Sequence, residues 1–489
     1  MPGRKSILWL YVISAFFIAL NTYFIATEQY FFSFIPLVLL VIMVAVFALD
    51  KLIFGIVLFT PLSLPLYQFI PGLDFNMFLP TEPLLFGVLI LFLFKLLIDR
   101  SFDKKILYHP LSVLILINLL WILITSFTST MTVVSLKFFL SRLWFIVGFY
   151  LLGIQLFKNK KNIGKYFWLY TFSLLIVIGY TFIRQSHYGF QDQEAANFTV
   201  NPLYNDHTAY AAALSMLFPV MIGLLFLKEY SYIQRIAAFV VLSVLILALV
   251  FSYTRAAWLS VVFAFVMFLV VVFKIKFRTF LLIGASTIIV LLLFWTQVYM
   301  KLEKNRQDSS SDFSKQIQSV TNISTDASNK ERLNRWSCAI RMFKERPVFG
   351  WGPGTYMFKY APFQHSYERT IISTNAGDLG NAHSEYLGPL AESGVFGSLS
   401  FLAIVLASIY YAMRVYRRTN DKSEKIIVLS VLIGLITYYV HGVMNNFLDT
   451  DKLSALFWGF TAIIVSFDLR LTENEKTESS KPEKTPQQE

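Results

Sequence analysis

The chain of 489 residues contains one cysteine, Cys338, so no internal disulfide framework can form. Charged residues are also scarce, at 15% of the chain, whereas hydrophobic residues make up 56% and include 49 phenylalanines. A water-soluble domain cannot bury that much apolar surface, and the apolar runs are long enough to cross a bilayer. The sequence therefore predicts a polytopic membrane protein.

Recognisable metal and phosphate motifs are missing as well. None of the six histidines has a His-Glu-x-x-His or similar metal-ligand spacing. Asp449-Thr-Asp451 supplies two carboxylates, which make only a partial hard-metal site, and a solvated turn is the favoured interpretation. Gly350-Trp-Gly-Pro-Gly354 lacks the Lys-Ser/Thr ending of a P-loop, which favours a simple turn. We expect no metal and no cofactor.

The net charge of +12 suggests a nucleic-acid partner until the basic residues are located. They gather in alternate short loops, at 4–5, 100–105, 158–161, 274–278 and 414–418. The loops on the other side hold few, chiefly Arg184, Arg255 and Lys452. The positive-inside rule explains this asymmetry. It predicts cytoplasmic termini, a long loop outside the membrane and no nucleic-acid partner.

The predicted fold is all-α, a transmembrane helical bundle of about 12–14 spans with a large, partly helical extracytoplasmic loop near the C-terminal end. The fourteen apolar runs lie near 7–26, 31–49, 52–70, 82–98, 109–127, 136–157, 166–184, 208–227, 236–252, 257–273, 279–297, 394–413, 425–443 and 452–468. Residues 31–70 could instead form a hairpin or a re-entrant segment, because 52–70 contains Pro61 and Pro65.

Four regions follow from this pattern. An N-terminal bundle covers 1–297, the outer loop 298–393 and the C-terminal transmembrane helices 394–470. The remaining 471–489 are rich in Lys, Glu, Ser, Pro and Gln and read as a disordered cytoplasmic tail.

An amphipathic helix is predicted in the outer loop. Ser328 and Glu331 have the spacing of a capping box, and Pro347 marks the far end. Arg332 and Arg335 lie on one flank of an apolar stripe made by Leu333, Trp336, Ile340 and Phe343. Such a helix would rest at the headgroup level and hold two guanidinium groups there. The alternative is an anchor whose arginines meet ordinary lipid phosphates.

His383 is the candidate general base, because it shortly precedes a predicted span and a histidine suits proton abstraction near neutral pH. Glu385 and Glu392 follow it as candidate supporting residues. Arg255 and Arg142 lie at or near the outer ends of predicted spans. A cation there must snorkel to the surface or face a polar interior, so both are candidate site residues.

The order and sidedness of these motifs resemble the O-antigen ligase and O-antigen polymerase family. The matching pieces are Thr254-Arg255-Ala-Ala, then Arg332-x-x-Arg335-Trp leading to Pro347-Val-Phe-Gly-Trp-Gly352, then His383-x-x-Tyr-Leu387 with Glu392-x-Gly394. Ser384 stands where the family commonly has Asn, and the spans exceed the usual dozen.

The resemblance implies glycosyl transfer on the outer face of the bacterial cytoplasmic (inner) membrane. The donor would be a glycan on undecaprenyl diphosphate, and the acceptor lipid A–core or another glycan. Arg255, Arg332 and Arg335 would bind the diphosphate, because the guanidinium fork matches phosphate oxygens. His383 would deprotonate the acceptor hydroxyl, and direct displacement would invert the anomeric carbon.

The alternatives stay open at this stage. A polymerase would use the same donor as a ligase, which is our first choice. A flippase or transporter of lipid-linked glycans suits the span number but not a large ordered outer loop. A non-catalytic assembly protein is the third possibility.

Overall fold

The computed structural model describes residues 4–69, 77–98, 102–276, 327–368, 373 and 380–479. Nearly all regular structure in them is helical. Their one sheet pairs two short antiparallel strands, β1 (Leu64–Pro65) and β2 (Phe78–Leu79), with Leu64 opposite Leu79. The predicted all-α class is confirmed.

The chain divides into two units, Met1–Gly55 and Ile56–Glu489. The first contains α1 (Arg4–Ala26), a 3₁₀ turn (Tyr30–Phe34) and α2 (Ile35–Phe47). Within it, Phe32 packs against Phe17 and Phe24, with ring centroids 5.3 and 4.9 Å apart. The next helix, α3 (Leu49–Phe59), leads from the first unit into the second.

The predicted span at 52–70 is wrong. The helix α3 ends at Phe59, and 3₁₀ turns (Thr60–Leu62 and Leu66–Gln68) flank β1. Pro61 and Pro65 account for this, because each lacks the N–H that a continuing helix needs.

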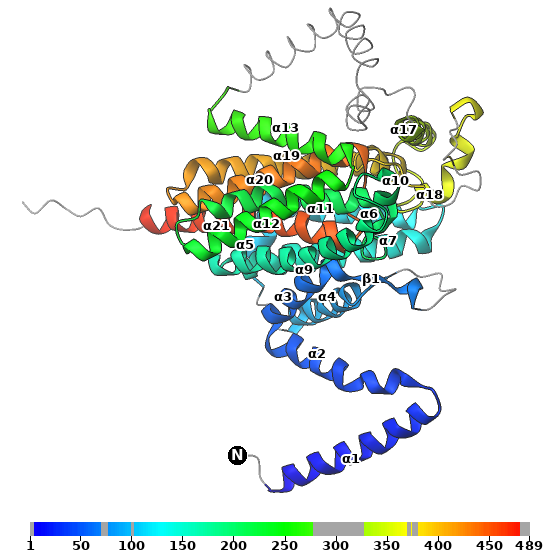
Figure 1. Ribbon diagram of the computed structural model, residues 1–489, viewed down its shortest axis with the longest axis vertical. Coiled ribbons are helices and arrows are strands. Elements are labelled where there is room, and N and C mark those ends of the chain that lie inside the picture. Colours follow the sequence, from blue (N-terminus) through cyan, green and yellow to red (C-terminus); the bar gives the residue numbers. More distant parts are fainter. Residues whose placement is uncertain are drawn as a thin grey trace, which may run out of the picture. The chain divides into compact units, whose positions relative to one another are not determined.

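The second unit holds the long helices, which run side by side (Figure 1). In chain order they and the shorter ones are α4 (Thr81–Ile98), α5 (Lys104–Tyr108), α6 (Pro110–Phe127), α7 (Thr132–Phe145), a π-helical segment (Ile146–Leu151), α8 (Leu152–Phe157), α9 (Lys160–Ser186), α10 (Gln193–Thr199), α11 (His207–Leu225), α12 (Tyr232–Phe251), α13 (Arg255–Val272), α17 (Ala327–Glu345), α18 (Tyr356–Lys359), two 3₁₀ turns (Ala361–Phe363 and Ser366–Glu368), α19 (Leu387–Arg418), α20 (Lys422–Met444) and α21 (Asp451–Ser479).

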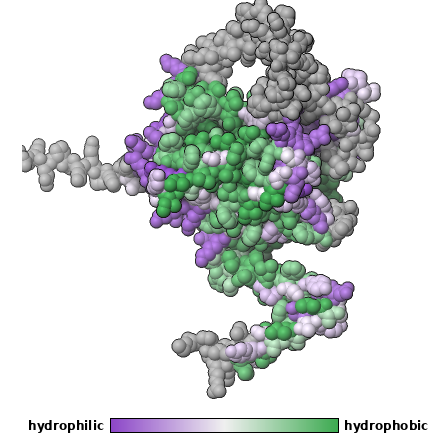
Figure 2. Space-filling view, viewed as in Figure 1, coloured by the Kyte–Doolittle hydropathy of each residue, from purple (hydrophilic) through white to green (hydrophobic). Residues whose placement is uncertain are grey.

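Eleven helical segments of the described residues are long and apolar enough to cross a membrane, and Tyr11–Ala26 is a shorter apolar helix. The predicted span at 279–297 lies outside the described residues. Figure 2 shows hydrophobic residues across the middle of the bundle and hydrophilic residues at its two ends. Exposed apolar side chains such as Phe239 on α12 and Val262 on α13 contribute to this lipid-facing surface.

Polar residues fix where several helices begin. The side chains of Asp103, Asn159, Asp192, Asp206 and Asp421 accept hydrogen bonds from the first N–H groups of the helices they precede. Ser231 and Gln234 form a full capping box at the start of α12. The buried helix α21 lies at the centre of the bundle, since nearly every residue from Asp451 to Phe467 is buried.

Three ion pairs join the loops that the sequence places on one side. Lys105 lies 2.7 Å from Glu473, Lys158 lies 2.6 Å from Asp103, and Lys160 lies 2.8 Å from Asp421. These basic loops therefore share one end of the bundle, and their cytoplasmic location remains a prediction.

The predicted tail boundary needs correction. The last helix, α21, continues to Ser479, whereas the sequence predicts disorder from 471. Glu473 pairs with Lys105, and Glu475 with Arg418, so polar partners hold a segment whose composition alone suggests disorder. The final residues, 480–489, lie outside the described part of the chain.

Candidate functional site

The amphipathic helix predicted in the outer loop is α17, which spans Ala327–Glu345. Leu333 and Ile340 are 43% and 40% exposed, so the apolar stripe faces outward and is available to lipid. The opposite face is buried against α18, α19 and the segment between them, where Cys338 and Met342 join one cluster. Arg335 lies on this inner face and is 3% exposed. Its guanidinium is therefore enclosed by protein, and its predicted place at the headgroup level remains a prediction.

Arg335 is held tightly. Its Nε donates to Glu331 Oε1 at 2.7 Å, and its guanidinium lies 3.8 Å from the centre of the Tyr360 ring. A Cβ at Gly380 would collide with the same guanidinium, so the chain passes close over it. Ser328 lies inside α17 rather than at its N-cap, and Glu331 serves Arg335 instead of a capping box. Among the described residues, Nη1 of Arg335 is buried and has no hydrogen-bond partner.

His383 lies in residues 381–385, which we name the histidine turn. Its backbone has a positive φ of 48°, its N–H donates to Asn381 Oδ1 at 3.0 Å, and its carbonyl accepts from Trp336 Nε1 at 3.3 Å. The turn is thereby fixed against α17. Burial, together with the charges of Arg332 and Arg335, lowers the pKa of His383 from 6.5 to about 4. The ring is therefore neutral at pH 7, with a lone pair to accept a proton.

Three residues missed by the sequence reasoning also belong to this region. The carboxylate of Asp206 acts on the pKa of His383, partly offsetting the effect of the two arginines. His207 Nδ1 lies 3.1 Å from Asp206 Oδ1 at the start of α11. His441, near the end of α20, is fully buried, and its Nε2 lies 3.1 Å from Asn445 Nδ2. The available signal was their position, since each lies at the outer end of a predicted span.

Glu385 anchors the histidine turn to the rest of the bundle. Its N–H donates to the carbonyl of Gly442 at 2.7 Å. Its carboxylate accepts from Phe447 N at 2.7 Å, Leu448 N at 2.9 Å and the Tyr438 hydroxyl at 2.6 Å. A buried carboxylate with three donors holds both the turn and the connection between α20 and α21. Its predicted supporting role remains a prediction.

The side chain of Ser384 forms hydrogen bonds with nearby backbone groups. Its hydroxyl oxygen accepts from the backbone N–H groups of Tyr386 and Leu387, both at 3.3 Å. The side chain therefore satisfies two donors at the start of α19, a task that an Asn carbonyl can also perform.

Arg142, Glu385 and Glu392, the three predicted supporting residues, line one cavity of about 40 Å³. Arg142 Nη1 donates to the carbonyl of Leu448 at 2.8 Å, and Glu392 Oε1 accepts from Tyr356 N at 3.0 Å. The cavity borders the histidine turn at Glu385, and the described residues that line it do not include His383. Their arrangement favours positioning over direct contact with a substrate.

The carboxylates of Asp449-Thr-Asp451 have different partners. Asp449 is exposed on the turn between α20 and α21. Asp451 accepts a hydrogen bond from Thr81 and lies 3.4 Å from Lys452 Nζ. No group of three or more His, Cys, Asp or Glu residues suited to a metal occurs in the described part of the chain.

The glycine-rich stretch forms a turn that we name the clasp, made of residues 347–354 and 391–395. Trp351 N donates to Ala391 O at 3.1 Å, Gly352 N to Glu392 O at 2.8 Å, and Val395 N to Pro347 O at 2.9 Å. Gly394 has a φ of 69°, and a Cβ there would collide with the carbonyl of Val348. The interpretation as a turn is confirmed, since these amides bind backbone carbonyls.

Arg255 is the first residue of α13, directly after the buried Thr254. Ser252, three residues earlier, lines a small cavity together with His207. The starts of α11 and α13 therefore lie near one another, and a diphosphate role for Arg255 remains a prediction.

Comparison with known families bears on this geometry. Residues 237–402 match the family model described as O-antigen ligase, about a third of the chain. The chain carries an O-antigen ligase domain. The match supports membership of the O-antigen ligase family, as the motifs predict, and indicates membrane glycosyl transfer of this general type. The O-antigen ligase domain contains Arg255, Arg332, Arg335, His383, Glu385 and Glu392. No curated protein matches the chain.

Proposed function

We propose that this protein transfers a glycan from undecaprenyl diphosphate to an acceptor hydroxyl on the outer face of the cytoplasmic membrane, without a metal and with inversion. The observation that carries the proposal is the packing of α17 against the histidine turn, where Trp336 Nε1 donates to His383 O at 3.3 Å and the charges of Arg332 and Arg335 act on the His383 ring. All four residues lie inside the O-antigen ligase domain.

The arginines suit the leaving group. The acceptor oxygen bonds to the anomeric carbon as the bond from that carbon to the diphosphate oxygen breaks, and the diphosphate leaves with the electron pair. Guanidinium groups stabilise the charge that develops on it. Arg335 is already oriented by Glu331 and Tyr360, and its Nη1, which has no partner in the described part of the chain, can donate to the leaving diphosphate.

His383 suits the proton transfer. A pKa of about 4 makes it a weaker base than an ordinary histidine, yet keeps it in the accepting form at neutral pH. The acceptor hydroxyl becomes acidic only as its oxygen bonds to the anomeric carbon. A weak base is therefore sufficient, provided that proton transfer follows bond formation.

The test is a transfer assay with the purified protein. Undecaprenyl diphosphate carrying a glycan is supplied with lipid A–core or with a second lipid-linked glycan, and the products are separated by thin-layer chromatography. We expect a product that persists with excess chelator and is lost in His383→Ala. Product on lipid A–core identifies a ligase, and product on the second glycan a polymerase. Absence of product with either acceptor would contradict the proposal.

The proposed sidedness has its own test. Ser366→Cys, at an exposed position of the outer loop, and Lys422→Cys, at the opposite end of the bundle, are each made in a Cys338→Ser background. The replaced thiol is buried, and burial raises its pKa to about 11. An impermeant maleimide should label only Ser366→Cys in intact spheroplasts. The reverse pattern would invert the topology and remove the proposed donor.

A further inference from the structure

The ring of His383 is subject to charges of opposite sign from two elements. Arg332 and Arg335 belong to α17, whereas the carboxylate of Asp206, directly before α11, acts on the ring in the opposite direction. A diphosphate is stabilised beside the arginines and destabilised beside a carboxylate. In an in-line displacement, the acceptor hydroxyl approaches the anomeric carbon from the side opposite the leaving diphosphate. The start of α11 is therefore on the side suited to the acceptor.

Asp206 and His207 form a fixed pair at this start. Asp206 Oδ1 lies 3.1 Å from His207 Nδ1 and accepts from Thr208 N at 2.8 Å, and Oδ2 accepts from Thr208 Oγ1 at 2.7 Å. A carboxylate can only accept, so the His207 proton lies on Nδ1, and Nε2 of the neutral ring carries a lone pair. The side chains of Asp206 and His207 are 42% and 21% exposed, so a ligand can reach both.

His441 supplies a hydrogen-bond donor. Asn445 Nδ2 lies 3.1 Å from His441 Nε2. Because an amide NH₂ group can only donate, Nε2 accepts this bond and the ring proton lies on Nδ1. His441 is fully buried, and its Nδ1 has no hydrogen-bond partner in the described part of the chain. Buried polar groups are rarely left unpaired, so this N–H marks a place where a ligand oxygen can bind.

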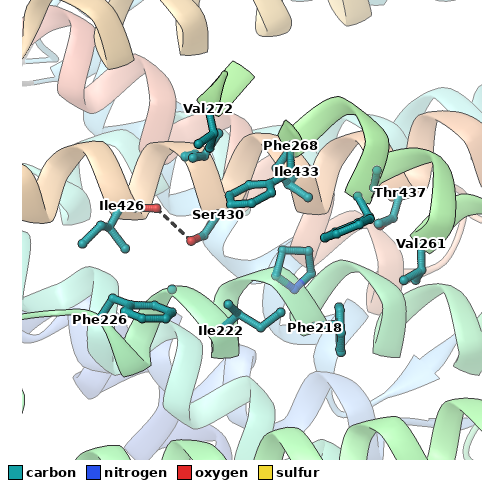
Figure 3. A pocket seen from close by; sticks show the side chains of 15 residues that line it. Phe218, Ile222, Phe226, Val261, Phe268, Val272, Ile426, Ser430, Ile433 and Thr437 are labelled. Atoms are coloured by element: carbon teal, nitrogen blue, oxygen red, sulfur yellow. Dashed lines mark hydrogen bonds between the residues drawn. The ribbon is translucent and has the colours of Figure 1, made fainter. Parts of the chain in front are cut away.

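Two hydroxyl groups of α20 line an apolar cavity of about 370 Å³ between α11, α13 and α20 (Figure 3). Ser430 Oγ donates to the carbonyl of Ile426 at 2.8 Å, and Thr437 Oγ1 to that of Gly434 at 2.7 Å. Both hydroxyl protons are therefore used within the helix. His441 lies one turn beyond Thr437, and its Nδ1 proton is still available to a polar ligand.

His207 and His441 lie at a similar level of the bundle. A Cβ at Gly223 of α11 would collide with Ser430 of α20, and a Cβ at Gly434 of α20 would collide with the Met216 carbonyl of α11. These two contacts show that the helices run antiparallel. From the second contact, His441 lies about 10 Å further along α20 and His207 about 13 Å back along α11, toward the same end.

The histidine turn reaches this level as well. Glu385 N donates to the carbonyl of Gly442 at 2.7 Å, and Gly442 directly follows His441. The charge of Asp206 acts on the ring of His441 and also on that of His383. The three histidines are thus gathered around one carboxylate.

We infer that Asp206, His207 and His441 bind the acceptor sugar, an inference that rests on the proposed function. Each sugar hydroxyl can donate and accept, so His207 Nε2 accepts from one hydroxyl and His441 Nδ1 donates to an oxygen of the same sugar. Asp206 orients His207 and disfavours the diphosphate on this side, which selects a neutral polyol. His383 then receives only the proton of the attacking hydroxyl.

The inference is tested with acceptors that each lack one hydroxyl. In the unaltered protein, loss of the hydroxyl bound by His207 should raise the acceptor KM about three- to tenfold, the effect of one neutral hydrogen bond. His207→Phe should raise the acceptor KM equally, leave the donor KM unchanged and abolish the effect of the missing hydroxyl. An undiminished hydroxyl effect in His207→Phe, or no hydroxyl effect in the unaltered protein, would overturn the inference.

His441→Phe should act in the same way on a second hydroxyl. His187→Phe is the matched control, because His187 is an exposed histidine directly after α9. It should change neither KM. Equal acceptor KM values for His207→Phe, His441→Phe and the control would overturn the inference.

A labelling experiment separates this inference from the proposed function and needs no variant. Lipid A–core and a second lipid-linked glycan, each with a diazirine on its terminal sugar, are cross-linked to the protein. Label is expected on peptides of 201–210 or 439–448, and the same glycan without diazirine should compete, whereas inorganic diphosphate should not. Labelling there without any transfer would leave the acceptor site standing and reject the proposed reaction. Labelling elsewhere with both probes would overturn the acceptor site.

Discussion

The clasp and the histidine turn look equally like functional motifs in the sequence, yet their hydrogen bonding differs. In the clasp, the backbone N–H groups of Trp351, Gly352 and Val395 donate to carbonyls across the turn. In the histidine turn, the backbone is also bonded, but no hydrogen bond among the described residues engages the ring nitrogens of His383. The clasp therefore holds structure together, whereas the ring of His383 has no such role within the described part of the chain.

The same contrast separates two buried charges. Glu385 receives three donors, all at Oε1, and these hydrogen bonds stabilise the fold around it. Arg335 is fixed through Nε, while its Nη1 has no hydrogen-bond partner among the described residues. Buried polar groups without partners are rare in folded proteins, so they mark the places where a ligand can contribute.

The largest expected effect comes from removing the reactive ring. His383→Ala should lower turnover by roughly a hundred- to ten-thousand-fold while leaving donor affinity nearly unchanged, because the ring acts on a proton rather than on the diphosphate. His365→Ala is the matched control, since His365 is exposed. Single-turnover rates and donor binding are measured separately. Normal turnover in His383→Ala would contradict the reactive role of the histidine turn.

The second-largest effect is expected from replacing Arg332, which removes a positive charge near His383. Arg332→Ala should weaken donor binding or turnover by about ten- to two-hundred-fold, the equivalent of roughly 1.5–3 kcal/mol for one charge-assisted contact. Arg332→Lys should recover part of this, because charge is kept and the fork is lost. The exposed Arg346, beside the clasp, supplies the control Arg346→Ala. Equal behaviour of the two alanine variants would argue against a diphosphate site.

A substitution in the clasp should lower the free energy of unfolding rather than turnover. Gly394→Ala places a Cβ against the carbonyl of Val348 at a positive φ and should cost roughly 1–3 kcal/mol or more. Gly179→Ala, in α9 with no atom within 4 Å of the new Cβ, should be neutral or slightly stabilising. Thermal unfolding measures both. A Gly394→Ala variant with unchanged stability and lost turnover would assign the clasp a direct role.

The smallest effect is a shift along the pH axis. The neutral form of His383 accepts the proton, and its pKa of about 4 lies below the ordinary 6.5. Turnover should therefore stay level from neutral pH down through 6.5 and fall only near pH 4. Arg332→Gln removes one charge that lowers this pKa, so the acidic limb should move toward 6.5. A limb that already lies at 6.5 in the unaltered protein would contradict the described environment of His383.

The sequence predicted the features that depend on length and order. Long apolar runs indicated the spans, and the order of Arg332, Arg335 and His383 predicted that they act together. The burial of Arg335 was not predictable, because the residues that enclose its guanidinium, Tyr360 and Gly380, lie far along the chain from α17. Here the buried face of α17 is partly polar. The ion pair between Glu331 and Arg335 offsets the free-energy cost of burying the Arg335 charge.

Long-range partners account for the other differences. Asp206 and His207 lie in sequence far from His383, so nothing local connects their charges. The persistence of α21 to Ser479 depends on Lys105 and Arg418, which composition cannot reveal. Where a residue's role depends on a partner far along the chain, the local sequence pattern is insufficient to predict that role.

The clasp also depends on residues outside the region 237–402 that matches the family model. Trp121 Nε1 donates to Ser393 O at 2.7 Å, Thr130 N to Trp351 O at 3.0 Å, and Ser135 Oγ to Pro353 O at 2.8 Å. All three donors lie on α6, α7 or their connection, before the matched residues 237–402. A chimera that exchanges 237–402 alone would break these contacts. A cassette that also carries residues 121–135 would keep the clasp and the segment that supports it together.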